Sequence, residues 1–157
     1  MTILNVAIND IIDPDWGNSV ANEINARGVK DYASITADQG SITTETDVTG
    51  LTVTWTASTS RLYRISFAGQ LSSSVNATDW GWIKVTDSSN NAKVDVAVDQ
   101  LSSGLGKPFH GSVFETGLSG SITRKLRAAR LAGTGNISVR AATTSPAFIL
   151  VEDIGPA

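Results

Sequence analysis

Apolar and polar residues alternate along residues 51–71 more regularly than anywhere else in the chain. A period of two residues is typical of half-buried antiparallel strands. The short link at residues 57–60 favours a local hairpin, in which each strand turns one apolar face to a common core. The apolar positions are Leu51, Val53, Trp55, Tyr63, Ile65, Phe67 and Leu71.

Shorter runs of the same kind fill the remainder of residues 31–157. Turn-forming residues separate them about every 8–15 positions, a spacing that favours a sandwich or barrel of short strands. Breaks such as Thr49-Gly50 and Gly133–Asn136 supply residues that accept a positive φ. We therefore predict an all-β, antiparallel fold. Strands are expected at 32–37, 41–46, 51–56, 61–71, 79–86, 93–98, 110–116, 122–131, 136–142 and 147–154, with a surface loop at Asp99–Phe109.

The first 30 residues follow a different pattern. Alternation over residues 4–8 predicts an extended arm, and one short α-helix is expected from about Pro14 to Arg27. Asp13 can cap its start, and Gly28 can take the left-handed conformation that ends it. An apolar stripe along this helix either closes one end of the chain's own β-sandwich or docks on another protein. The candidate anchor residues are Leu4, Val6, Ile8, Trp16, Val20 and Ile24.

Composition and charge narrow the possible partners. The chain has 157 residues, a net charge of −3 and only 17% charged residues, so no basic field is expected to attract nucleic acid or anionic lipid. No segment approaches the ~20 apolar residues of a membrane span, and the start lacks the features of a secretory signal. There is no cysteine, which excludes disulfides and thiolate sites. We expect synthesis in a host cytoplasm, no nucleic-acid partner and no membrane insertion.

Residues with catalytic or metal-binding chemistry are few. A lone histidine at the start of a strand is far more often structural than a general base. No spacing places two of the four glutamates on one face, although a fold can still pair them. The loop aspartates lack the spaced pattern of a calcium loop. We predict no enzyme activity, no catalytic residue, no metal and no cofactor; the residues considered are His110, Glu23, Glu45, Glu115, Glu152, Asp87, Asp95 and Asp99.

Two tryptophans and one glycine-containing loop are the candidates for ligand contact. Trp80 and Trp82 share one face of a predicted strand. There they form either a layer of the core, which we favour, or a platform on which a sugar ring stacks. Gly104 and Lys107 lie in the predicted surface loop, where contact residues concentrate. This loop has neither the length nor the following helix of a phosphate-binding loop.

The C-terminal strand is apolar on both faces. Ala147, Ile149 and Val151 alternate with a second apolar set, of which Phe148 and Leu150 are the largest members, together with Ile154. The two sheets of one sandwich cover only one face of such a strand. We therefore predict that the protein self-associates through part of the exposed apolar face.

Four segments resemble known proteins. They are DPDWGNSVANEINARG at 13–28, TDVTGLTVTWTA at 46–57, RLYRISFAG at 61–69 and SPAFILVEDIGP at 145–156. Together they resemble small virion proteins of tailed actinobacterial phages, namely minor tail proteins, head fibres and decoration proteins. The resemblance implies a jelly-roll-like β-sandwich, often trimeric, that is displayed on the particle surface and attached by its N-terminal part.

Two classes of function follow from these observations. The first is a non-enzymatic virion structural protein at the virion surface, in which residues 1–30 form the anchor and residues 31–157 form the β-sandwich. Its partners would be copies of itself, as a homotrimer, and a major capsid or tail protein. The alternative is an adhesin at the tail tip that binds a host-surface carbohydrate through Trp80 and Trp82 or through the Asp99–Phe109 loop.

Overall fold

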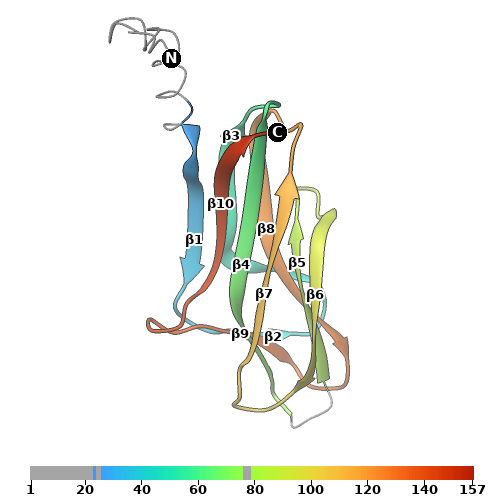
Figure 1. The fold of residues 1–157 in the computed structure, drawn as a ribbon. Coiled ribbons are helices and arrows are strands. Elements are labelled where there is room, and N and C mark those ends of the chain that lie inside the picture. The colour runs from blue at the N-terminus through green and yellow to red at the C-terminus, as the bar shows by residue number, and fades with distance from the viewer. Residues whose placement is uncertain (1–22, 24–25, 76–78) are drawn as a thin grey trace, which may run out of the picture.

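The computed structural model describes residues 23, 26–75 and 79–157 (Figure 1). Ten strands in this part of the chain form two antiparallel sheets. Every strand expected from the sequence is present, and the ends differ by up to five residues. The strands are β1 Gly28–Ile35, β2 Gln39–Ile42, β3 Thr46–Ala57, β4 Arg61–Ser73, β5 Asp79–Thr86, β6 Ala92–Leu101, β7 Lys107–Glu115, β8 Gly120–Ala132, β9 Ile137–Arg140 and β10 Ala147–Pro156.

Sheet A has the order β1-β10-β4-β9-β2, with β7 also paired to β4, and sheet B has the order β3-β8-β5-β6. In sheet A, β10 pairs with residues 61–68 of β4 and β9 with residues 70–73. β9 and β10 thus form one interrupted strand along β4. β1 and β2 form a second interrupted strand alongside them, because β1 pairs with β10 and β2 with β9.

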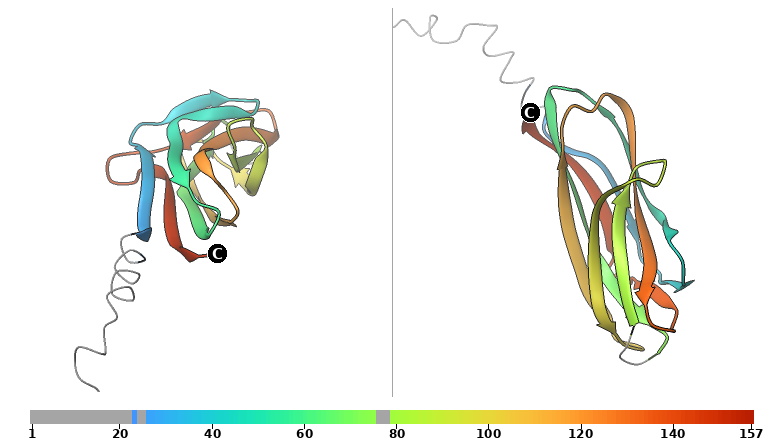
Figure 2. Two further views of the ribbon diagram at one scale, coloured as in Figure 1. Left: turned by 90° about the horizontal axis from the view of Figure 1, so that it is seen from above. Right: turned by 90° about the vertical axis from the view of Figure 1, so that its right-hand side faces the viewer.

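Counting each interrupted strand once gives the connectivity of a jelly roll. Sheet A then has four rows, β1/β2, β9/β10, β4 and β7, which face the four strands of sheet B. Viewed from above, the two sheets enclose one interior (Figure 2). In chain order the chain changes sheet at every step except between β5 and β6, which form a hairpin in sheet B, and the first strand lies beside the last, as in double Greek-key jelly rolls. The predicted all-β sandwich and its jelly-roll form are therefore confirmed.

The expected hairpin between β3 and β4 is wrong. β3 pairs with β8 in sheet B, whereas β4 pairs with strands of sheet A, so the link at residues 57–60 is an arch that crosses from one sheet to the other. The Ser58 N–H donates to the Tyr63 hydroxyl at 2.9 Å, and the Arg61 N–H donates to the Ser58 carbonyl at 3.1 Å. A short polar link suits an arch as well as a hairpin, and alternation within a strand does not select its partner.

The core lies between the inner faces of the two sheets. The common apolar core predicted for residues 51–71 is confirmed, because all seven apolar positions are buried. Each large aliphatic or aromatic side chain buried in this way contributes about 1.5–3 kcal/mol. The inner face of β10 contributes Ala147, Ile149 and Val151, which are fully buried.

Side chains of β1 and β2 reach the free edge of β3 in the opposite sheet. The Asp31 carboxylate accepts the Thr54 N–H at 2.7 Å. The Gln39 amide accepts the Thr49 N–H at 2.7 Å and donates to the Asp47 carbonyl at 3.0 Å. Three backbone groups of the sheet B edge are thereby bonded to side chains of sheet A.

The chain enters β1 through the last turn of a helix. The Arg27 N–H donates to the Glu23 carbonyl at 3.3 Å, and Gly28 follows with a φ of 106°. The predicted left-handed stop at Gly28 is confirmed. The predicted helix start and the anchor residues Leu4, Val6, Ile8, Trp16, Val20 and Ile24 lie outside the described residues.

Candidate functional site

All four glutamates bind a cationic side chain. They come from separate elements, as expected, and the fold brings no two of them together as a catalytic pair would require. His110 lies exposed on β7. Among residues 23, 26–75 and 79–157, no group of three His, Asp or Glu side chains is placed to hold a metal ion. The ion pairs are Glu23–Arg61, Glu45–Lys84, Glu45–Arg127, Glu115–Arg124 and Glu152–Arg64.

A chain of ion pairs joins the helix end to the sandwich. Arg61 at the start of β4 donates through Nε to both oxygens of the buried Asp153, at 3.0 and 2.8 Å. Its Nη1 binds Glu23, which also binds Arg27. The carboxylates of Asp153 and Glu23 raise the pKa of Arg61, and Arg61 and Arg27 lower the pKa of Glu23. The junction between the helix and β1 is thus fixed to the body by charge.

The outer face of sheet A carries an apolar strip, which consists of Tyr32, Phe148 and Leu150. Tyr32 is 51% exposed, and its ring centroid lies 6.1 Å from that of Phe148. Tyr32 also pairs with Leu150 across β1 and β10. Phe114 on β7 is 57% exposed and lies on the same face, opposite Arg64. The two-sided apolar pattern predicted for β10 is therefore present, and its outer side meets no other element of the described chain.

Trp80 and Trp82 lie on the outer face of sheet B. Trp80 is 44% exposed, and Lys84 Nζ lies 3.6 Å from the centroid of the Trp82 ring. The interpretation that both tryptophans form a core layer is wrong. The intervening residues of β5 face inward, with Ile83 and Val85 fully buried, and a strand can turn only one of its faces to the core. The alternative, an exposed aromatic platform, fits Trp80, whereas Trp82 is half-buried beside it.

The same face of sheet B carries a network of charges. Arg127 Nε lies 2.6 Å from Asp47, Lys125 Nζ lies 2.9 Å from Asp47, and Lys84 Nζ lies 2.8 Å from Glu45. Burial raises the pKa of Asp47, but Lys125 and Arg127 outweigh that effect and lower it. The basic residues of β8 are thus divided and neutralised: Lys125 and Arg127 lie outside, and Arg124 is buried against Glu115. Lys125, Arg127 and Arg124 therefore form no common basic patch.

Asp79 is fully buried at the start of β5 and holds the turn between β8 and β9. Its carboxylate accepts the N–H groups of Thr134 at 2.8 Å and Gly135 at 3.2 Å, and it also accepts the Ser73 hydroxyl. Burial raises the pKa of Asp79, but these hydrogen bonds and the charge of Arg130 outweigh burial and hold the pKa below its ordinary value. This site is structural, because the Asp79 carboxylate oxygens already accept hydrogen bonds from other residues of the chain.

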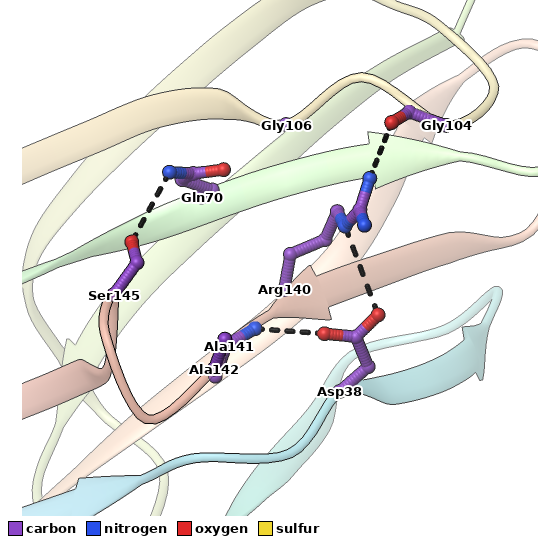
Figure 3. Close-up of a pocket in the computed structure, with 8 residues that line it drawn as sticks. All are labelled: Asp38, Gln70, Gly104, Gly106, Arg140, Ala141, Ala142 and Ser145. Carbon is purple, nitrogen blue, oxygen red and sulfur yellow. Dashed lines mark hydrogen bonds and ion pairs between the residues drawn. The ribbon is translucent and has the colours of Figure 1, made fainter.

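A polar pocket of about 270 Å³ opens where three loops meet (Figure 3). Arg140 at the end of β9 donates to the Gly104 carbonyl at 2.5 Å, and its Nε lies 3.7 Å from Asp38. Asp38 accepts the Ala141 N–H at 2.8 Å. The lining residues are Asp38, Gln70, Gly104, Gly106, Arg140, Ala141, Ala142 and Ser145.

The pocket contains one of the four residues predicted for ligand contact. Gly104 lines it, whereas Lys107 binds the Asp99 carbonyl at 2.9 Å and the Asp99 carboxylate at 3.6 Å. The predicted loop is also shorter than expected, because β6 and β7 extend into it and leave only residues 102–106. The other lining residues were missed because they come from distant segments with no common spacing.

In the part of the chain that the structure describes, no helix is long and apolar enough to span a membrane.

Comparisons with known proteins assign no family. No family model matches the chain, and no curated protein matches it. Similar folds occur in the structure of infectious bursal disease virus Gx strain, with 15% identity over 82% of this chain and 32% of that chain and a TM-score of 0.47. The VP2 subviral particle of the same virus is 12% identical in sequence over 83% of this chain and 42% of the VP2 chain, with a TM-score of 0.40. BiXyn10A CBM1 in its apo form is 10% identical in sequence over 78% of this chain and 96% of the CBM1 chain, with a TM-score of 0.32.

The chain spans less than half the length of the two virus chains it matches. Since identities do not exceed 15% and TM-scores stay below 0.5, these likenesses carry no functional argument. The resemblance to phage virion proteins therefore stays a prediction from the sequence.

Proposed function

We propose that this protein is a non-enzymatic structural component of the virion surface, assembled from several copies and attached to a larger virion protein through residues 1–30. The sequence resemblance to phage decoration, head-fibre and minor tail proteins supports this role. A jelly roll alone does not specify function, because the same fold serves many. The exposed surface of the sandwich therefore has to carry the argument.

The observation that carries the proposal is the apolar strip on sheet A. Tyr32 is 51% exposed, and together with the half-buried Phe148 and Leu150 it forms a contiguous apolar surface on one sheet face. A contiguous exposed apolar surface is a candidate site of contact with another protein. Next to it, Arg64 binds Glu152 at 2.7 Å. The neighbouring charges are thus neutralised within the chain and do not oppose contact with another copy of the chain.

The partner we assign to this strip is a second copy of the same chain, in a homotrimer. Threefold assembly is what the phage resemblance implies, and closed symmetry lets the same patch on every copy be covered. Attachment to a capsid or tail protein is assigned to residues 1–30, which lead into the sandwich at the start of β1.

Leu150→Glu is expected to dissociate the trimer into monomers. A carboxylate at the centre of the strip would have to be buried without a partner, which weakens association by at least about a hundredfold. Multi-angle light scattering at micromolar concentration should show a trimer for the wild type and a monomer for the variant. Thr56→Glu, at an exposed position on β3 of sheet B, is the matched control and should remain trimeric. A wild-type monomer under these conditions would contradict the assembly.

Electron microscopy of whole particles tests the location. Many copies on the head are expected for a decoration protein or head fibre, whereas a few copies at the tail tip would favour host recognition. Absence of the protein from purified particles would refute the virion role altogether.

The second candidate is an adhesin that binds a host-surface carbohydrate. It is favoured by Trp80, which is 44% exposed on the outer face of sheet B and is available for stacking on a sugar. Trp82 lies beside it but is half-buried, with Lys84 Nζ over its ring. Its discriminating test is binding to host cells. If the platform recognises the host, the wild-type protein should bind host cells and Trp80→Ala should abolish that binding. A wild-type protein that does not bind host cells would refute the adhesin.

A further inference from the structure

The pocket on the lower part of sheet A has polar side chains that are already held in place. Arg140 is oriented by the Gly104 carbonyl, and Asp38 is oriented by the Ala141 N–H. Gly104 has a φ of 73°, a conformation that suits glycine. Because these partners come from three different loops, each side chain is fixed by a neighbour from another loop (Figure 3).

Several polar atoms of the pocket remain free for a ligand. Gln70 Nε2 donates to Ser145 Oγ at 3.3 Å, while Gln70 Oε1 and Arg140 Nη2 make no hydrogen bond to any other residue that the structure describes. Gly106 leaves room for Gln70, since a Cβ at this position would collide with the Gln70 side chain. The pocket therefore presents an amide oxygen, a guanidinium N–H, a hydroxyl and a carboxylate side by side.

The charge and the volume of the pocket restrict which ligands it can bind. Asp38 offsets the charge of Arg140, so the pocket offers no net positive field to an anion. Its volume of about 270 Å³ lies just below the ~300–1,000 Å³ of pockets for drug-sized ligands. A small neutral ligand with several hydroxyls satisfies both restrictions, because each hydroxyl can donate to Asp38 or Gln70 and accept from Arg140.

We propose that this pocket binds one neutral sugar residue, held by Asp38, Gln70, Arg140 and Ser145. The site lies on the outer side of sheet A and is separate from the tryptophan platform on sheet B. It goes beyond the proposed structural role and does not depend on it, because a sugar site would operate on the isolated protein as well as on a particle.

The test is a titration of the ¹⁵N-labelled full chain with glucose, galactose, mannose and N-acetylglucosamine, each at millimolar concentration. At least one of these sugars should shift the backbone amide signals of Gly104, Gly106 and Ala141 and the side-chain amide of Gln70. Sialic acid and inorganic phosphate serve as anionic probes and should bind more weakly, because Asp38 opposes them.

Two variants examine the residues directly. Asp38→Asn keeps an oxygen for the Ala141 N–H but replaces the sugar-binding carboxylate oxygen, and Gln70→Leu removes the free amide oxygen; each should weaken binding at least about tenfold. Asp95→Asn, on exposed β6, changes the charge equally and should leave affinity unchanged. Thermal unfolding confirms that each variant is folded.

Three outcomes would overturn the assignment. The first is that no sugar shifts the pocket signals. The second is that the sugars shift only the Trp80 and Trp82 indole signals, which would move the site to sheet B. The third is equal weakening by Asp38→Asn and Asp95→Asn. Sugar binding with no virion incorporation would refute the proposed function while leaving the pocket intact, so the two failures are distinguishable.

Discussion

Removal of residues 1–27 is expected to leave a soluble, folded β-sandwich that no longer joins the particle. β1 begins at Gly28, and the buried core is contributed by residues within the strands. The deletion removes Glu23 from Arg61, but Asp153 still accepts three hydrogen bonds from that arginine. Incorporation should fall below detection in particles assembled with the truncated chain, because several apolar side chains of the arm, each worth about 1.5–3 kcal/mol when buried, are lost together.

The control for this deletion lies in the loop at residues 102–106. Substitutions there should spare incorporation and alter only what the outer surface contacts. The competing interpretation, that the helix closes its own sandwich, predicts instead that Trp16→Ala lowers the melting temperature of the isolated protein. If Trp16→Ala destabilises the free protein while particles incorporate it normally, the anchor hypothesis fails. Limited proteolysis should also leave a resistant fragment that starts near Gly28, because β1 begins there and is paired with β10.

Asp79→Ala is expected to destabilise the protein by about 3–5 kcal/mol. The substitution leaves the N–H groups of Thr134 and Gly135 and the Ser73 hydroxyl without an acceptor in a buried site, and each unsatisfied group costs about 1–3 kcal/mol. Such a loss is a large share of the ~5–15 kcal/mol that stabilises ordinary domains. Urea unfolding measures it, and Asp95→Ala on the exposed face of β6 should change the free energy of unfolding by less than about 0.5 kcal/mol.

The same carboxylate makes stability depend on pH. Because the folded state lowers the pKa of Asp79, its stabilisation is fully present above the ordinary carboxyl pKa and is lost as the pH falls through the folded value. Asp79→Asn cannot titrate at this position. The difference in unfolding free energy between wild type and Asp79→Asn should therefore shrink as the pH is lowered below the ordinary carboxyl range. A constant difference across this range would refute the role of the charge.

Alternation predicted the strands well but could not select their partners. All ten were expected at nearly the right positions, because buried and exposed faces differ in composition along β3, β4 and β10. The same pattern could not tell a hairpin from an arch at residues 57–60, since both need only a short polar link. It also misplaced Trp80 and Trp82, because both faces of β5 are apolar and only the opposite sheet determines which one is covered.

The pocket could not have been predicted from spacing. Asp38, Gln70 and Arg140 are separated by tens of residues and meet because β9 and β10 are one strand interrupted beside β4. Gly104 was predicted as a ligand-contact residue because glycines indicate surface loops, and binding residues concentrate in such loops. Lys107 was predicted for the same reason, but it binds Asp99.

The contacts that Asp31 and Gln39 make with β3 have a consequence for the proposed assembly of several copies. An open strand edge invites pairing with the edge of a neighbouring molecule and can seed fibrous aggregates. Here the Thr54 and Thr49 N–H groups and the Asp47 carbonyl are already bonded within the chain. Recruitment of a foreign strand along this part of β3 would first have to break those bonds, so edge-to-edge growth from this strand is disfavoured at high local concentration.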